Sequence, residues 1–260
     1  MKNKFDLTGK TALITGGCGL LGPKHAEAIL EFGGNIILAD IVSENKANEV
    51  VDKLNSKNVS FVHMDVTDRK SIEDAVSKYD TIDILINNAA YDPKVEDDFD
   101  WKNKFEHLDL DDWNKTIEVT LTGTFLCCQV IGNKMLSNKN GGVILNISSD
   151  LSVISPDQRI YDGGVKPASY GVAKAGVVNL TKYLSTYFAK KNIRVNALSP
   201  AGIYNDKLSD DFLSRITNLI PMGRMATIDE YKGAIVFLCS DASAYMTGHN
   251  LIVDGGRTVW

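Results

Sequence analysis

The sequence is short of the residues that build metal centres and disulfide frameworks. Its 260 residues include only four cysteines and four histidines, and no C-x-x-C pair occurs. Cys127 and Cys128 are neighbours on a predicted helix, and the other two cysteines are far away in the chain. Scattered cysteines of this kind are most often buried free thiols. We therefore expect neither a disulfide framework nor a metal site.

A positive charge excess and long apolar runs are also missing. The 28 basic and 33 acidic residues give a formal net charge of −5, whereas proteins that bind nucleic acids need a basic face. No apolar run approaches the roughly 18 residues that cross a bilayer, and Asp6 and Thr8 precede the first apolar stretch, so no signal peptide is visible. We expect a cytoplasmic protein whose partners include neither nucleic acid nor membrane.

The chain instead alternates short apolar runs with amphipathic helical segments. Strands are predicted at 11–15, 35–40, 59–66, 83–90, 142–149, 193–198 and 250–254. Helices are predicted at 23–32, 47–54, 72–79, 110–136, 168–191 and 227–238, the last with a capping box of Thr227 and Glu230. This order predicts an α/β fold, a doubly wound, Rossmann-type parallel sheet of about seven strands with helices on both faces. We expect one domain over residues 1–260.

Two segments interrupt the alternation and are predicted to be inserted loops. Residues 91–112 are rich in acidic and aromatic side chains and show no clean period. Residues 150–167 contain two prolines and a Gly-Gly pair. A third stretch, 201–222, is polar and irregular with short helical potential. Both insertions follow predicted strands, so we expect them at the edge of the sheet where ligands bind.

A glycine-rich loop follows the first predicted strand. Gly17-x-Gly19-x-x-Gly22 lies between a strand and a helix, which is the context that a dinucleotide fingerprint requires. The glycines allow a pyrophosphate to approach the N-terminus of the helix, where free N–H groups favour an anion. The alternative is a glycine turn without a ligand.

Asp40 supports the dinucleotide interpretation. It ends the second predicted strand, 18 residues after Gly22, where a carboxylate accepts hydrogen bonds from the ribose hydroxyls of adenosine. The same carboxylate repels a 2′-phosphate, and no Arg or Lys lies between Gly16 and Gly22 to compensate. The sequence therefore favours NAD over NADP.

Tyr170 and Lys174 are a candidate catalytic pair. Their i, i+4 spacing places both side chains on one face of a predicted helix, near its start and near the ligand-binding edge of the sheet. Tyr187 and Lys191 repeat the spacing, but about 25 Å farther along the same helix at 1.5 Å per residue. We interpret Tyr187 as structural.

With these motifs the chain resembles the short-chain dehydrogenase/reductase family over essentially its whole length. The matching pieces are the loop at 15–22, Asp40, Asp65-Val66, Asn87-Asn88-Ala89-Ala90, Ser148-Ser149, Tyr170 with Lys174, Arg194-Val195-Asn196 through Pro200, and Asp254-Gly255-Gly256. The resemblance implies a nicotinamide cofactor and a catalytic set of Ser149, Tyr170 and Lys174. It further implies cofactor contacts from Gly16, Cys18, Gly19, Leu21, Asp40, Ile41, Asp65, Val66, Asn88, Ala89, Tyr170, Lys174, Pro200 and Ile203.

The implied mechanism requires a tyrosine whose pKa is lowered. A free tyrosine titrates near 10, and a catalytic acid/base works best near 7. Lys174 and a cationic nicotinamide ring would both stabilise the phenolate. Ser149 would hydrogen-bond the carbonyl oxygen of the substrate and orient it.

The chain departs from the family pattern at three places. Leu20 stands where the family's loop usually has a glycine. Thr120 stands where many members have an Asn that holds a water of the proton relay, so Thr120 is a candidate for that role. The spacing from Ser149 to Tyr170 is longer than usual, and the extra residues include Arg159, which either binds a substrate carboxylate or phosphate or is a solvated loop charge.

We therefore expect an NAD(H)-dependent oxidoreductase that interconverts a secondary alcohol and a ketone on a small polar, sugar-like substrate. Residues 156–161 are also similar to a segment of oxidoreductases from bacterial surface-sugar and flagellin-modification pathways. The alternatives are a 3-oxoacyl-carrier-protein-type reductase and a non-catalytic dinucleotide-binding module. Apolar residues on more than one face of helices 110–136 and 168–191 indicate a homodimer or homotetramer.

Overall fold

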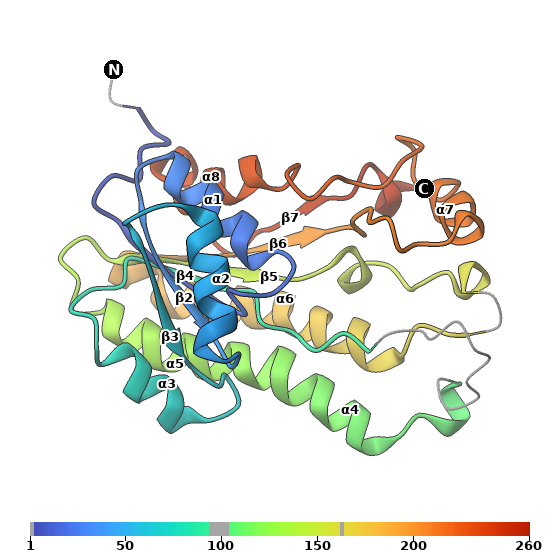
Figure 1. Cartoon of the computed structure of the whole chain (residues 1–260), viewed down its shortest axis with the longest axis horizontal. Coiled ribbons are helices and arrows are strands. Elements are labelled where there is room, and N and C mark those ends of the chain that lie inside the picture. Colours follow the sequence, from blue (N-terminus) through green and yellow to red (C-terminus); the bar gives the residue numbers. More distant parts are fainter. Residues whose placement is uncertain (1–2, 94–103, 162–163) are drawn as a thin grey trace.

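All seven described strands form one parallel sheet. The computed structural model describes residues 3–93, 104–161 and 164–260. The strand order is β3-β2-β1-β4-β5-β6-β7 (Figure 1). The strands are β1 (Thr11–Thr15), β2 (Asn35–Asp40), β3 (Val59–His63), β4 (Ile84–Asn87), β5 (Gly142–Ile147), β6 (Ile193–Pro200) and β7 (Asn250–Val253). The predicted doubly wound Rossmann-type sheet is confirmed.

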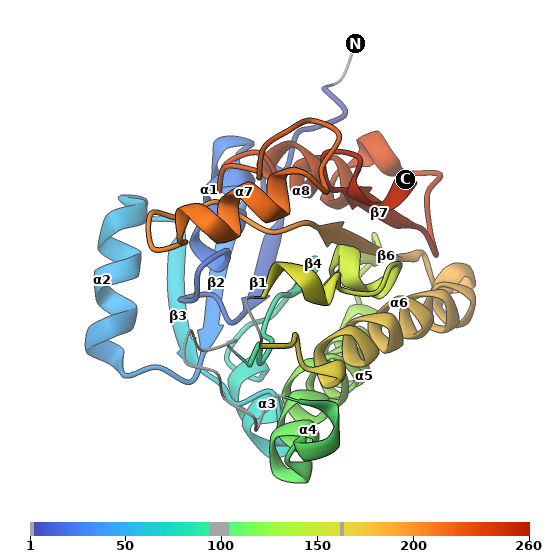
Figure 2. The ribbon, with the colours of Figure 1, turned by 90° about the vertical axis from the view of Figure 1, so that its right-hand side faces the viewer.

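Helices cover both faces of this sheet (Figure 2). One face carries α1 (Gly22–Glu31), α2 (Glu44–Leu54) and α8 (Lys232–Cys239). The other carries α3 (Arg69–Val76), α5 (Gly123–Met135) and α6 (Ala168–Phe188). Two short helices, α4 (Leu110–Thr116) and α7 (Asp210–Thr217), lie toward the end of the molecule that holds the inserted segments.

The strands read as continuous apolar runs because both sides of the sheet are buried. In β1, Leu13 points into the core beneath α3, α5 and α6, whereas Ala12 and Ile14 point into the core beneath α1 and α8. All three side chains are fully buried. The described cysteines are free, and all but Cys18 are buried in these two cores.

The helix predicted at 110–136 is interrupted in its middle. A π-helical turn, Ile117–Thr122, separates α4 from α5. Thr120 lies within it, and the Thr124 hydroxyl donates to the Thr120 carbonyl at 2.7 Å. Hydroxyl bonds to the carbonyl four residues earlier are typical of bent or widened helix segments. Such a π-turn cannot be detected from the spacing of apolar residues in the sequence, because it shifts that spacing by only one residue.

The last predicted helix begins later than its capping pattern indicates. The Thr227 amide donates to the Glu230 carboxylate at 2.7 Å, which is the return half of a capping box. Residues 228–231 nevertheless form a turn in which the Lys232 amide bonds to the carbonyl of Asp229, and α8 begins at Lys232. The polar pattern therefore marks the turn that precedes the helix.

The two predicted insertions are partly structured. In 91–112, a short helical turn covers Phe105–His107 and α4 begins at Leu110, while 94–103 lie outside the described residues. In 150–167, helical turns cover Asp150–Ser152 and Gln158–Ile160, while 162–163 lie outside the described residues. The amphipathic helix α7 packs against the second insertion in a small core of Ile160, Ile216, Ile220 and Met225.

None of the described helices is both long and apolar enough to cross a membrane. The expected cytoplasmic location stays a prediction.

Candidate active site

The main candidate site is a cavity of about 600 Å³ at the carboxyl ends of the parallel strands. It spans the β1–β4 pair, where the strand order reverses and where doubly wound sheets bind their ligands. The predicted site residues that line it are Gly16, Gly19, Leu21, Asp40, Ile41, Asp65, Val66, Asn88, Ala89, Ser149, Tyr170, Lys174, Pro200 and Ile203. Cys18 and Thr120, the other two predicted residues, are not among its lining residues.

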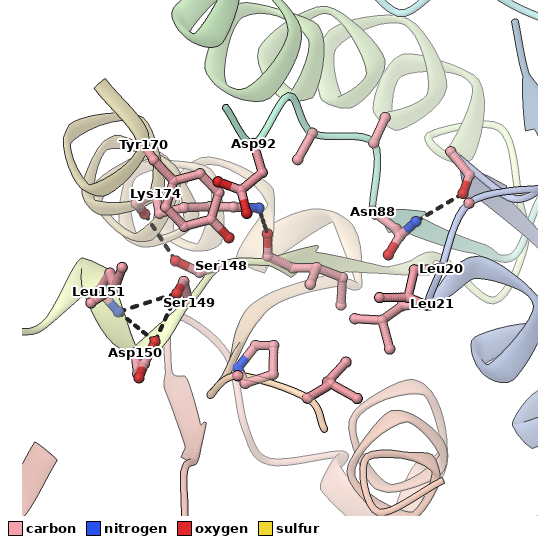
Figure 3. A pocket seen from close by; sticks show the side chains of 18 of the residues that line it. Leu20, Leu21, Asn88, Asp92, Ser148, Ser149, Asp150, Leu151, Tyr170 and Lys174 are labelled. Atoms are coloured by element: carbon pink, nitrogen blue, oxygen red, sulfur yellow. Dashed lines mark hydrogen bonds between the residues drawn. The ribbon is translucent and has the colours of Figure 1, made fainter. Parts of the chain in front are cut away.

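The glycine loop lies directly against the end of β4. Gly16 has φ +60°, and a Cβ at this position would lie 2.9 Å from the Ala89 Cα. The Asn88 side-chain amide donates to the Gly16 carbonyl at 3.0 Å (Figure 3), and the Thr15 hydroxyl accepts from the amides of Asn88 and Ala89. Only glycine fits the backbone angle and the contact together. The glycine loop, which we call the glycine cradle, is therefore held in place by residues at the ends of β1 and β4.

The Asp40 carboxylate is fixed by backbone amides. Its Oδ2 accepts from the Cys18 amide at 2.9 Å, and its Oδ1 accepts from the Ile41 amide at 2.8 Å. Cys18 therefore contributes through its backbone, and burial, followed by the nearby Asp40 charge, raises the pKa of its thiol to about 11. A glycine turn that the backbone of a ligand can approach, with a fixed carboxylate beside it, fits a nicotinamide dinucleotide, whose adenosine ribose Asp40 would hold.

Ser149, Tyr170 and Lys174 meet on the opposite side of the cavity (Figure 3). Ser149 follows β5, and the other two lie in the first two turns of α6. The Ser149 hydroxyl donates to the Asp150 carboxylate at 2.9 Å and accepts from the Leu151 amide at 3.2 Å. The Lys174 ammonium donates to the Ile147 carbonyl at 2.8 Å, which ties α6 to the end of β5. The structure brings the predicted catalytic residues together.

Burial controls the protonation of this group in the structure. It raises the pKa of Tyr170 above the usual 10, and the charge of Asp92 raises it further, while the polar hydroxyl of Ser149 lowers it. Burial lowers the pKa of Lys174 to about 8. The depressed tyrosine pKa expected from the sequence is therefore absent from the protein alone, because desolvation of the phenolate outweighs the effect of Ser149.

Two ion pairs beside the catalytic group were missed by sequence reasoning. Lys166 pairs with Asp92, and its ammonium lies 4.5 Å from the centre of the Tyr170 ring. Arg257 pairs with Asp150 at 2.7 Å in a nearly fully buried contact. All four residues line the cavity. They come from the two insertions and the segment after β7, where no spacing rule indicates a contact.

Three other sequence candidates lie away from the cavity lining. Arg159 pairs with Asp157 at 2.5 Å and its side chain is 86% exposed, so the solvated-charge interpretation fits it. Tyr187 stacks with Tyr183 on the outer surface of α6, with ring centres 6.5 Å apart. Thr120 is buried, and its hydroxyl accepts from the Tyr91 amide at 3.1 Å. Its relay role stays a prediction.

Among the residues that the structure describes, no cluster of three or more His, Cys, Asp or Glu is arranged to hold a metal ion.

Fold and site together define a dinucleotide-dependent oxidoreductase. A sequence model of the family described as "Enoyl-(Acyl carrier protein) reductase" matches residues 21–258. The chain belongs to the short-chain dehydrogenase/reductase family.

Three relatives of similar sequence or structure are named for small polar substrates. An NAD-dependent glycerol dehydrogenase of Listeria innocua is 34% identical over 98% of this chain and 96% of its own. A D-threitol dehydrogenase of Mycolicibacterium smegmatis is 34% identical over 98% and 95%. The crystal structure of a gluconate 5-dehydrogenase from Burkholderia cenocepacia, solved with NADP and tartrate, has a TM-score of 0.87 at 28% identity and covers 99% and 98% of the two chains.

Proposed function

We propose that this oxidoreductase uses NAD(H) to interconvert a secondary alcohol and a ketone on a small polyhydroxylated substrate. The observation that carries the proposal is that Ser149, Tyr170 and Lys174 line the same cavity as the glycine cradle and lie on its opposite side. A nicotinamide held by the glycine cradle and Asp40 would take up or supply the hydride. A reaction centre between the two sides of the cavity is therefore within reach of both a proton acceptor and the hydride carrier.

Each member of the catalytic group has a separate task in this proposal. During alcohol oxidation, Tyr170 as phenolate accepts the hydroxyl proton while the carbon loses its hydride, and the reverse reaction returns both. Ser149 holds the reacting oxygen. Lys174 supplies positive charge near the phenolate, with its ammonium 5.7 Å from the ring centre. Proton transfer by a positioned group of this type contributes about a hundredfold or more.

The NAD preference rests on Asp40. Its carboxylate lines the cavity and is held rigidly by the amides of Cys18 and Ile41, so it cannot turn away from a 2′-phosphate without losing both bonds. We expect NADH to bind at least about tenfold more tightly than NADPH, and Asp40→Asn to narrow the gap, because it removes the charge and keeps an acceptor oxygen. Calorimetry with both cofactors tests this, and equal affinities in the wild type would reject it.

The polar substrate class is supported by the charged lining. The side of the cavity that holds Tyr170 also carries Asp92, Lys166, Asp150 and Arg257. A lipid chain would cover these ion pairs with apolar surface and offer no hydrogen bond to their remaining polar atoms, which is unfavourable. Relatives named for glycerol and D-threitol fit the same substrate class.

A 3-oxoacyl-carrier-protein-type reductase is the second candidate, supported by relatives of that name from Chlamydia pneumoniae and Aquifex aeolicus that are 31% and 32% identical to this chain. An acidic carrier protein needs a basic docking surface. The described end of the first insertion and the start of α4 instead expose Glu106, Asp111 and Asp112. A non-catalytic module is less consistent with the site, since dinucleotide binding does not require Ser149 next to Tyr170.

The test is a pair of turnover assays. Oxidation is measured with NAD⁺ or NADP⁺ on glycerol, D-threitol and gluconate. Reduction is measured with NADH or NADPH on acetoacetyl thioesters. We expect NAD⁺-linked oxidation of at least one polyol. Reduction of the thioester alone would favour the second candidate, and cofactor binding without turnover of any substrate would favour the non-catalytic module.

We also propose that copies of the chain associate through the outer faces of α5 and α6. The two helices border a surface hollow of about 500 Å³. Phe125, Leu136, Tyr183 and Tyr187 lie along it and are between 40% and 64% exposed. Adjacent apolar side chains of this size on a surface are typical of an interface.

A further inference from the structure

One nitrogen of a buried arginine in the cavity wall has no partner. Arg257 is 7% exposed and lines the cavity. Its Nη1 donates to Oδ2 of Asp150 at 2.7 Å. Its Nη2 is buried and makes no hydrogen bond with any described residue. A buried guanidinium N–H without an acceptor is costly, which indicates a place where a ligand atom completes the site.

The backbone fixes this arginine in place. Gly255 and Gly256 both have positive φ, +66° and +90°. The Asp254 carboxylate accepts from the amides of Gly256 and Thr258 at 2.9 and 2.7 Å. The Asp254-Gly255-Gly256 motif forms this turn, and the turn places the Arg257 side chain in the buried wall of the cavity. The arginine is therefore presented in a fixed orientation.

Arg257 is also connected to the reacting end of the cavity. The Asp150 carboxylate that binds Arg257 accepts the Ser149 hydroxyl on its other oxygen, at 2.9 Å. Asp150 thus lies between the arginine and the serine (Figure 3 shows the serine side). Ser149 and Arg257 thus bond the two oxygens of one carboxylate and line one cavity, so a substrate with its reacting oxygen at Ser149 lies on the same wall as Arg257.

The charges nearby favour a neutral acceptor. Arg257 has the Asp150 carboxylate beside it, and Lys166 has that of Asp92. Arg257 and Lys166 are therefore each already neutralised by a carboxylate, and a substrate carboxylate would gain little net attraction from them. A hydroxyl oxygen can accept the remaining N–H without carrying charge into the wall.

We infer that the free Nη2 of Arg257 donates to a second hydroxyl of the substrate, so that Arg257 selects polyols over alcohols with one hydroxyl. This inference rests on the proposed oxidoreductase function and specifies its substrate class. A site built to bond a hydroxyl rejects an analogue that lacks it, because the protein donor then stays unpaired.

The test compares D-threitol with 2-butanol in wild type and Arg257→Lys, using NAD⁺. Lysine keeps a cation against Asp150 but lacks the second guanidinium nitrogen. We expect kcat/KM for D-threitol to fall at least tenfold, mainly through KM, while kcat/KM for 2-butanol changes less than threefold. Arg159→Lys, in the exposed ion pair of the same insertion, is the matched control and is expected to be silent.

Three outcomes would overturn the inference. An equal loss on both alcohols would show that Arg257 acts only by keeping Asp150 and Ser149 in place. No loss on either would show that Nη2 meets no substrate. A larger loss with gluconate than with D-threitol would assign the site to a carboxylate. If Arg257→Lys does not fold, Arg257→Gln, which keeps one N–H donor for Asp150, is expected to show the same selective loss.

Failure of the proposed function is distinguishable from these outcomes. If the wild type turns over none of these alcohols, ligand-observed NMR of D-threitol with the NADH-loaded protein still decides the role of Arg257. D-threitol binding that weakens at least tenfold in Arg257→Lys supports the inference. Equal binding by both proteins, or none by the wild type, rejects it.

Discussion

The ammonium of Lys166 lies 4.5 Å from the centre of the Tyr170 ring, nearer than the ammonium of Lys174 at 5.7 Å. Lys166 comes from the second insertion and pairs with Asp92 from the first. The charge of Asp92 raises the pKa of Tyr170. The two inserted segments therefore place one cation and one anion beside the proposed proton acceptor.

Removing these two charges is expected to shift the pH dependence of alcohol oxidation in opposite directions. Lys166→Met takes away a cation that stabilises the phenolate, so the Tyr170 pKa rises and the rising limb of kcat/KM moves to higher pH. Asp92→Asn removes an anion that opposes the phenolate, so the limb moves to lower pH. The control is Lys191→Met: the Lys191 ammonium lies 4.6 Å from the centre of the Tyr187 ring, away from the cavity, so its loss is expected to leave the pH dependence unchanged. Shifts of both variants in the same direction would contradict the argument.

Tyr170→Phe is expected to lower kcat at least about a hundredfold, because it removes the proposed proton acceptor while keeping the ring. NADH affinity, measured by fluorescence titration, is expected to stay within threefold. Tyr187→Phe carries the same change on the outer surface of α6 and is expected to be silent. Full activity in Tyr170→Phe would disprove the site assignment.

Thr120→Val separates a structural role from the predicted proton relay. The substitution removes the acceptor of the Tyr91 amide, which costs about 1–3 kcal/mol of unfolding free energy, and kcat is expected to change less than threefold. Thr120→Ser keeps the oxygen and is expected to restore stability. Urea denaturation and kcat measurements check both. A large loss of kcat at unchanged stability would instead establish the relay.

The sequence predicted the sheet and most of the cofactor side because those features depend on local patterns. The residues that follow β1, β2 and β4 occupy fixed positions next to strand ends, so the position of Asp40 and Asn88 at the cavity follows from the strand order alone. The lengths of β3, β4 and β5 were overestimated, since Asp65, Ala89 and Ser149 lie just beyond these strands.

The substrate side could not be predicted because its contacts join irregular segments far apart in the chain. Asp150 and Arg257 are 107 residues apart, and Asp92 and Lys166 are 74 apart. No period or capping rule relates such pairs. The packing of α7 against the second insertion, through Phe212 and Tyr161 with ring centres 6.0 Å apart, is equally long-range.

His25 is expected to make the fold sensitive to acid. Burial lowers its pKa to about 4 from 6.5, and its Nε2 has no partner among the described residues. Between these two values the unfolded chain binds a proton that the folded chain does not, so stability falls as the pH drops from 6.5 toward 4. The difference of about 2.5 units corresponds to about 3 kcal/mol at 1.36 kcal/mol each.

Urea denaturation between pH 4.5 and 7 measures this loss. In His25→Gln the slope of unfolding free energy against pH is expected to flatten. His63→Gln, at an exposed position on β3, is expected to keep the slope of the wild type. An unchanged slope in His25→Gln would assign the acid sensitivity to other groups.

The proposed association through α5 and α6 is tested by light scattering. Phe125→Glu with Tyr183→Glu places charges on the apolar hollow and is expected to lower the apparent mass at micromolar concentration. Phe5→Glu, at another exposed aromatic position, is expected to leave the mass unchanged. A wild-type protein that is monomeric under these conditions would reject the proposal.

The strand order reverses between β1 and β4, and the residues proposed for coenzyme choice and for substrate choice lie on opposite sides of this reversal. Asp40 is held by amides of the first two strand–loop units, whereas Arg257 is held by Asp150 and by the turn after β7. The two residues share no hydrogen-bonding partner, so the free energies of changes at each should add. A substitution that alters coenzyme preference at Asp40 is then expected to leave substrate preference at Arg257 unchanged, and the reverse, both in evolution and in engineering.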